Sequence, residues 1–257
     1  MTMVPMALTL LAHGSPDPRH ARSVASLAAR LDAAGIRTSA AYLDHHEPSP
    51  RRAAQALLDA GAGATTVVPL LVSPAYHARV DVPAAISAMR SEVPELEVAA
   101  AEPVGLHPLL LDAAAELLVG SQLPLDDRTG IILAASGSRD LRAVGAMESL
   151  FRVHGLALAG ALGVRAVRAA YLDGGRPLGR IRTLMRCVDG CASFVVVPMV
   201  IADGILRDRI ATAAGRYDVP VTPGVLADTD AMTDLVTLRA GSAPAPTRHA
   251  PPARART

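Results

Sequence analysis

The chain contains an internal repeat, which constrains its fold more than any other feature of the sequence. Three segments return in the same order: LLAHGS at 10–15 as LAASGS at 133–138, AAYLD at 40–44 as AAYLD at 169–173, and TVVPLLVS at 66–73 as FVVVPMVIA at 194–202. Tyr42 and Pro69 are 27 residues apart, and so are Tyr171 and Pro198. We therefore predict two copies of one unit, residues 1–122 and 123–240, that arose by duplication.

Each copy alternates strand-like and helix-like segments. In the first copy, runs rich in apolar and β-branched residues lie at 8–12, 36–43, 65–72 and 96–104. A segment with apolar residues at helical spacing follows each run, and several begin at an Asp or Ser beside a proline, as helices often do. This pattern predicts an α/β fold of two tandem flavodoxin-like parallel-sheet domains, with the active-site cleft between them.

Composition excludes several classes of protein. A formal net charge of +1 over 257 residues gives no basic surface for nucleic acid, and no apolar run approaches the ~18 residues of a membrane span. The first residues lack the basic start of a signal peptide, and two cysteines, Cys187 and Cys191, make no disulfide framework. We expect a cytoplasmic monomer whose tail, 241–257, is disordered because it has little to bury.

Three side chains suited to metal binding follow the first three strands of the first copy. His13 ends the first predicted strand, Asp44 ends the second, and His77 lies in the loop after the third. Loops at the carboxyl ends of parallel strands converge, and ligands bind there. Two imidazoles and one carboxylate suit a borderline divalent metal and leave a coordination position open.

The second copy lacks both histidines. Ser136 stands where the first copy has His13, and Leu206 stands where it has His77. The turn after the strand therefore does not require an imidazole, which indicates that the two histidines have another role. We expect one metal site per chain, in the first copy.

The carboxylate of the site has two candidates. Asp44 is kept as Asp173 in the copy without histidines, so it can also be explained as a turn cap. Glu47, three residues further along, competes for the role of metal ligand. The neighbouring His45 and His46 are either solvated or spare ligands.

LLAHGSPDPR, AYLDHHEPSP and VVPLLVSPAYHARVDVP resemble the three signature segments of the sirohydrochlorin chelatase family, whose fold is related to that of ferrochelatases. In that family two histidines and a glutamate hold the metal. The resemblance assigns His13 and His77 as catalytic residues and metal ligands, and Asp44 as the third ligand. Aspartate is one methylene shorter than the family's glutamate, so Glu47 stays an alternative.

The resemblance implies insertion of Fe²⁺ into sirohydrochlorin to form siroheme, with the metal as substrate and no permanently bound cofactor. Cobalt insertion for cobalamin synthesis and non-catalytic binding of metal or tetrapyrrole are the alternatives. Because sirohydrochlorin carries eight carboxylates, its site should have a cationic rim. The side chains expected to contact this substrate are Ser15, Arg19, Tyr76, Arg79 and Arg139.

Overall fold

The computed structural model describes residues 6–72, 80–137, 141–173 and 176–245. The chain divides into two compact units. The first comprises Met1–Pro16, Val24–Gly105 and Val236–Thr257, and the second comprises Asp17–Ser23 and Leu106–Leu235.

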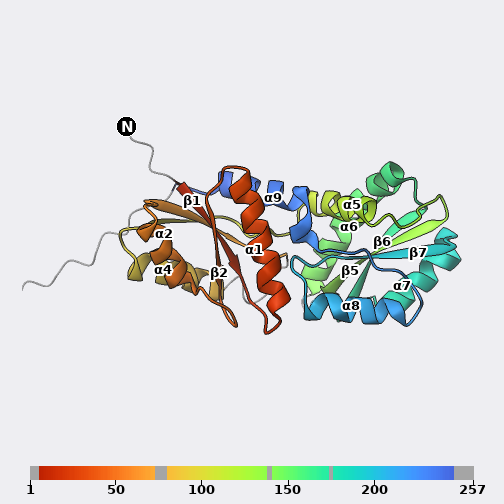
Figure 1. Ribbon diagram of the computed structural model, residues 1–257. Helices are drawn as coiled ribbons and strands as arrows, with labels where there is room; N and C mark the ends of the chain where they lie inside the picture. The colour runs from red at the N-terminus through yellow and green to blue at the C-terminus, as the bar shows by residue number, and fades with distance from the viewer. Residues whose placement is uncertain (1–5, 73–79, 138–140, 174–175, 246–257) are drawn as a thin grey trace, which may run out of the picture. The chain divides into compact units, whose positions relative to one another are not determined.

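The first unit is built on a parallel sheet of four strands (Figure 1). The strands are β1 (Met6–Ala12), β2 (Thr38–Tyr42), β3 (Ala64–Pro69) and β4 (Glu97–Ala100). Their order is β2-β1-β3-β4, so the chain runs outward in both directions from the centre. All carboxyl ends therefore lie at one edge of the sheet, which confirms the predicted fold class.

Helices α2 (Pro50–Asp59) and α4 (Asp81–Glu92) pack on one face of this sheet. Ser49 caps α2, its side chain accepting the Arg52 N–H, and Pro50 occupies the first helical position. Both helices contribute to one buried cluster with the strands. Its members include Leu11, Ala41, Ala54, Leu57, Val67, Ile86, Met89 and Val98.

Helix α1 (Pro18–Ala33) supplies apolar residues at helical spacing, as predicted. Val24, Leu27 and Leu31 are almost completely buried. Leu8 and Leu10 of β1 alternate with Ala7 and Leu11, which belong to the cluster on the α2 and α4 side. The two sets of β1 side chains thus point to opposite faces, so both faces of the sheet are buried.

The second unit has a parallel sheet of order β6-β5-β7. Its strands are β5 (Thr129–Gly137), β6 (Ala166–Asp173) and β7 (Ser193–Pro198). A single bridge from Val196 to Val221 stands where a fourth strand would pair with β7. The order therefore matches that of β2-β1-β3 in the first unit, as the sequence repeat predicts; the duplication itself stays an inference from sequence.

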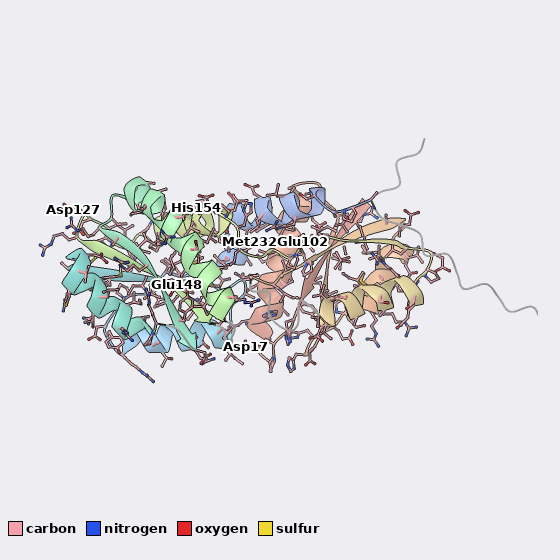
Figure 2. The ribbon with its side chains drawn as sticks, turned by 180° about the vertical axis from the view of Figure 1, so that it is seen from behind. Asp17, Glu102, Asp127, Glu148, His154 and Met232 are labelled. Atoms are coloured by element: carbon pink, nitrogen blue, oxygen red, sulfur yellow. The ribbon has the colours of Figure 1, made fainter. Side chains whose placement is uncertain are left out.

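The remaining helical elements belong to the second unit, except that the last helix of the chain begins in the second unit and ends in the first. They are α5 (Leu109–Gly120), α6 (Leu141–Leu162), α7 (Leu178–Leu184) with a π-helical turn at Met185–Asp189, α8 (Ile205–Gly215), a short 3₁₀ turn at Leu226–Asp228, and α9 (Asp230–Gly241). Met232 of α9, labelled in Figure 2, has no exposed surface.

The units divide one helix earlier than the expected boundary at residue 122. Helix α5 belongs to the second unit, where the Glu116 carboxylate accepts the backbone N–H groups of Asp230 (2.6 Å) and Ala231 (2.9 Å) at the start of α9. The later part of α9 belongs to the first unit, where Arg239 donates to the Val104 carbonyl. These hydrogen bonds join residues more than 100 positions apart and lie within the units to which the two helices belong.

Two further expectations concern the ends of elements and the membrane. Helix α9 ends at Gly241, the first residue of the expected tail, and residues 246–257 lie outside the described residues. In the described part of the chain, none of the helices combines the length and the apolar character that a membrane span requires.

Candidate metal and substrate site

His13 and Asp44 lie side by side at the carboxyl edge of the first sheet. β1 and β2 pair in parallel up to Ala12 and Tyr42, and the pairing continues beyond the strands. The Leu43 N–H donates to the Ala12 carbonyl (3.0 Å), and the Asp44 N–H donates to the His13 carbonyl (2.9 Å). The backbone therefore joins two of the predicted metal ligands directly.

Gly14 permits this close approach. Its φ is +96°, a conformation that glycine adopts without strain. A Cβ at this position would lie only 1.8 Å from the Asp44 carbonyl oxygen. Any other residue would push the two segments apart, so Gly14 fixes the spacing of His13 and Asp44.

The His13 imidazole is half-buried, and its Nδ1 lies 3.3 Å from the Gly14 carbonyl oxygen. If Nδ1 carries the proton it donates to that carbonyl, which leaves Nε2 as the lone-pair nitrogen. A neutral imidazole held in this tautomer is able to bind a metal or accept a proton through Nε2.

The Asp44 carboxylate is largely open to solvent, its side chain 64% exposed. One oxygen accepts the His45 N–H (2.8 Å), and the other lies 3.5 Å from His45 Nε2. Asp44 thus caps its own turn, as the alternative interpretation holds, and still presents oxygen lone pairs outward. The geometry is compatible with both roles.

The Glu47 carboxylate has contacts of the same kind as Asp44 and is exposed to a similar extent. One of its oxygens accepts the Ser49 N–H (2.7 Å), and the other lies 3.5 Å from Arg52 Nη1. Both partners belong to the start of α2, so Glu47 stabilises that helix end. What distinguishes Asp44 from Glu47 is the backbone hydrogen bond that joins it to His13.

His77, Tyr76, Arg79 and Arg139 lie outside the described residues. Within the described ranges, no group of three His, Cys, Asp or Glu side chains is placed to hold a metal ion. His13 and Asp44 are accordingly the part of the predicted ligand set that the structure brings together. Ser15 is half-buried in the same turn after β1.

The second unit repeats this turn geometry without the histidine. Gly137 has a φ of +84°, and a Cβ there would lie 1.9 Å from the Asp173 carbonyl oxygen. The Asp173 carboxylate, however, accepts two hydrogen bonds from Arg209 Nη2 (3.0 and 3.1 Å). The Asp44 carboxylate of the first unit has no arginine partner among the described residues, whereas the Asp173 carboxylate of the second unit is paired with the Arg209 guanidinium. Sequence analysis missed Arg209, since nothing local connects residues 36 apart.

Arg19, expected to bind substrate, is held by carboxylates of the second unit. Its Nη2 donates to Asp17 (2.6 Å) and to Asp208 (2.5 Å), and its Nη1 lies 3.7 Å from Asp203. Asp17 immediately precedes α1 (Figure 2). A role for Arg19 in substrate binding stays a prediction, and it requires the guanidinium to leave these partners.

Arg19→Met is expected to destabilise the protein at neutral pH and to lose that effect in acid. Hydrogen bonds from Arg19 lower the pKa of Asp17 to about 2 and also lower the pKa of Asp208. Their stabilisation is complete above the unfolded-state pKa of about 3.9 and is lost as the pH falls through the folded-state values. Thermal unfolding midpoints from pH 7 to pH 2 measure the difference.

Arg180→Met is the control for this series, because Arg180 is exposed on α7 of the same unit. A midpoint difference between wild type and Arg19→Met that stays constant down to pH 2 would contradict the assignment.

Comparison with known families bears on this site directly. The CbiX family model matches residues 7–119, which include the turns of His13 and Asp44. We call residues 7–119 the CbiX segment. The CbiX segment contains the whole first sheet from Ala7 onward, and it extends through most of α5.

Two curated relatives match a larger part of the chain than the CbiX segment. The sirohydrochlorin cobaltochelatase of Priestia megaterium is 24% identical over 217 residues, which cover 82% of this chain and 69% of that protein. The sirohydrochlorin ferrochelatase of the same organism is 23% identical over 187 residues, covering 73% and 69%. The resemblance to the sirohydrochlorin chelatase family is confirmed.

A solved structure shows the same fold. SirB from Bacillus subtilis with Fe³⁺ superposes with a TM-score of 0.71 at 20% identity, covering 91% of this chain and 93% of that one. The similarity extends beyond the CbiX segment, so both α/β units are part of the shared architecture.

Proposed function

We propose that this protein is a sirohydrochlorin chelatase that inserts Fe²⁺ into the macrocycle to form siroheme. The observation that carries the proposal is the His13 and Asp44 pair, joined by a backbone hydrogen bond at the carboxyl edge of the CbiX segment. The names of both curated relatives support insertion of a metal into sirohydrochlorin. The metal is a substrate here rather than a resident cofactor.

The residues of the site match what metal insertion requires. Two pyrrole N–H protons must leave as the metal enters, so the site needs a base near neutral pH as well as a ligand that releases the ion. His13 meets both needs, because a neutral imidazole binds borderline metals and is able to accept a proton. His77 is proposed for the same two roles, with Asp44 supplying the anionic ligand.

The choice between iron and cobalt is part of the proposal. Imidazole and carboxylate ligands scarcely discriminate Fe²⁺ from Co²⁺, and the two relatives are named for one metal each. We propose Fe²⁺ as the physiological metal and Co²⁺ insertion for cobalamin synthesis as the alternative. We further propose that Ser15, Tyr76, Arg79 and Arg139 contact the tetrapyrrole, and that the enzyme acts in the cytoplasm as a monomer.

An anaerobic absorbance assay with sirohydrochlorin tests the function. The protein is expected to accelerate metal insertion above the uncatalysed rate with Fe²⁺ and Co²⁺, and the ratio of kcat/KM values identifies the preferred metal. Ni²⁺ serves as a third comparison. Binding of metal or tetrapyrrole without acceleration by any of the three would instead indicate a carrier or sensor.

Asp44 variants are expected to separate ligation from turn capping. If the carboxylate binds the metal, Asp44→Ala weakens metal affinity, whereas Asp44→Glu, which restores the family's longer side chain, keeps most activity. Asn caps a turn about as well as Asp, so Asp44→Asn isolates the ligand role. Metal Kd and turnover of the three variants, with Glu47→Ala beside them, are the measurements.

An Asp44→Asn enzyme equal to wild type in metal Kd and turnover would exclude Asp44 as a ligand. A larger loss in Glu47→Ala than in Asp44→Ala would move the carboxylate role to Glu47.

A further inference from the structure

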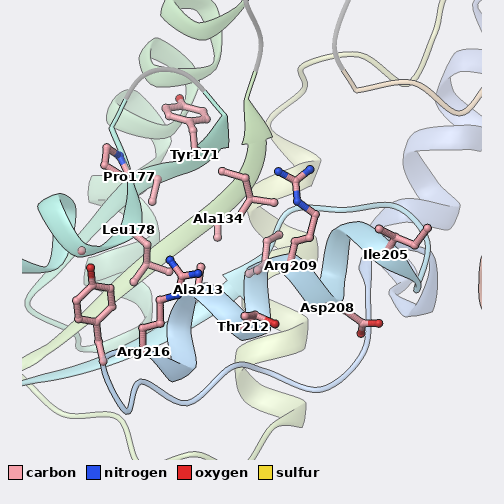
Figure 3. A pocket seen from close by; sticks show the side chains of 15 residues that line it. Ala134, Tyr171, Pro177, Leu178, Ile205, Asp208, Arg209, Thr212, Ala213 and Arg216 are labelled. Atoms are coloured by element: carbon pink, nitrogen blue, oxygen red, sulfur yellow. The ribbon is translucent and has the colours of Figure 1, made fainter.

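The second unit contains a pocket of about 490 Å³ beside helix α8 (Figure 3). It is lined by the end of β6 at Tyr171 and Leu172, the start of α7, and one side of α8. In the first unit, the corresponding helices α2 and α4 fill their side of the sheet with a buried apolar cluster. The second unit instead leaves space, of a size that is common for small-molecule sites.

The floor of this pocket is apolar. Ala134 of β5 and Leu178 of α7 are buried and line it together with Ala213 of α8. At one end, the Tyr217 hydroxyl packs so closely against Gly179 that a Cβ there would lie 2.1 Å from it. An organic ligand with an apolar body would find matching surface along this floor.

Two arginines line the pocket, Arg209 within α8 and Arg216 directly after its last residue. In Figure 3, Arg209 and Arg216 extend from α8 and from the residue after it, on the side where Ala134 and Leu178 lie. Their Cα atoms are seven residues apart, which at 1.5 Å per residue separates the roots of the two side chains by about 10 Å along the helix axis. The pocket therefore offers two guanidinium groups beside an apolar floor.

Both guanidinium groups have capacity for a ligand. Arg209 uses only Nη2 to reach Asp173, which leaves its other N–H donors available. The side chain of Arg216 has no hydrogen-bond or ion-pair partner among the described residues. Asp208, the acidic residue lining the pocket, is already paired with Arg19. Asp173 balances the charge of Arg209 and Arg19 balances that of Asp208, so the excess positive charge at the pocket comes from Arg216.

We propose that this pocket is a binding site for an organic dianion with an apolar body and carboxylate groups about 10 Å apart. Arginine binds carboxylates through paired N–H donors, so each guanidinium recognises one carboxylate. Such a ligand has two sources, the peripheral acid groups of a tetrapyrrole or a free dicarboxylic acid. The proposal does not depend on chelatase activity.

Calorimetric titration of the full-length protein with nonanedioate tests the proposal, because its two carboxylates span about the required distance when extended. Nonanedioate is expected to bind roughly tenfold more tightly than nonanoate, which has one carboxylate, and more tightly than butanedioate, which is too short. This comparison uses only the wild-type protein. Equal affinity for all three acids, or no binding of nonanedioate, would overturn the proposal.

Arginine variants then locate the site. Arg209→Met and Arg216→Met are each expected to reduce nonanedioate affinity to that of nonanoate, while Arg180→Met, an exposed arginine of α7 outside the pocket, keeps wild-type affinity. Unchanged affinity in Arg216→Met would refute the site. Displacement of nonanedioate by metal-free sirohydrochlorin assigns the tetrapyrrole as the source, and its absence assigns a free dicarboxylic acid; both results require the site to exist.

Discussion

His13→Ala is expected to lower turnover of sirohydrochlorin and metal by roughly 10²–10⁴, the usual range for loss of a general base. The His13 imidazole is half-buried at the carboxyl end of β1, and the backbone carbonyl of His13 accepts a hydrogen bond from the Asp44 N–H. Alanine keeps that backbone bond, so the loss isolates the side chain. Steady-state kinetics with Fe²⁺ and a separate metal titration measure the effect.

Folding should survive this change, because Ser136 occupies the matching turn of the second unit without an imidazole. Thermal unfolding of His13→Ala is thus expected near the wild-type midpoint. His77→Ala is expected to show a loss of similar size. Insertion rates near wild type in both variants would refute the catalytic assignment.

Gly14→Ala is expected to reduce turnover by about 10²-fold, because displacement of reacting groups by about 1 Å has that effect. A Cβ would lie 1.8 Å from the Asp44 carbonyl oxygen, so Asp44 must move away from His13. The positive φ adds a penalty of about 1–2 kcal/mol for any residue with a Cβ. We expect both a lower thermal unfolding midpoint and a higher Kd for the metal.

Gly137→Ala is the matched control. Its φ of +84° and its 1.9 Å approach to Asp173 reproduce the strain of Gly14 in the unit without histidines. The two variants should lose similar stability, and only Gly14→Ala should lose metal affinity. Equal loss of metal binding in both would show that the effect is global destabilisation rather than positioning.

Local patterns in the sequence are enough to predict most helices and strands of the first unit. β-branched and apolar runs identify β1 to β4, and Ser49–Pro50 identifies the start of α2, because caps and periodicity act over a few residues. The ends of strands are predicted less accurately than their positions along the chain. The expected strand at 96–104 is only Glu97–Ala100, since its ladder with β3 ends at Val67 and Pro103 has no N–H to extend a ladder.

The site could be predicted only in part. Placement of His13 and Asp44 at one edge follows from parallel strands, whose carboxyl ends meet there. Arg19 could not be placed in the same way. Its hydrogen bonds to Asp208 join residues 189 apart, so a local pattern gives no sign that its guanidinium is already occupied.

The sequence by itself determined the α/β class, the repeat and the His13 and Asp44 edge, because these depend on periodicity and on direct succession along the chain. Only the tertiary structure decided that Gly14 brings those residues together, that Arg209 pairs with Asp173, and that α8 borders a pocket lined by two arginines. Each of these depends on contacts between distant segments, whose distances are fixed when the strands pair and the helices pack.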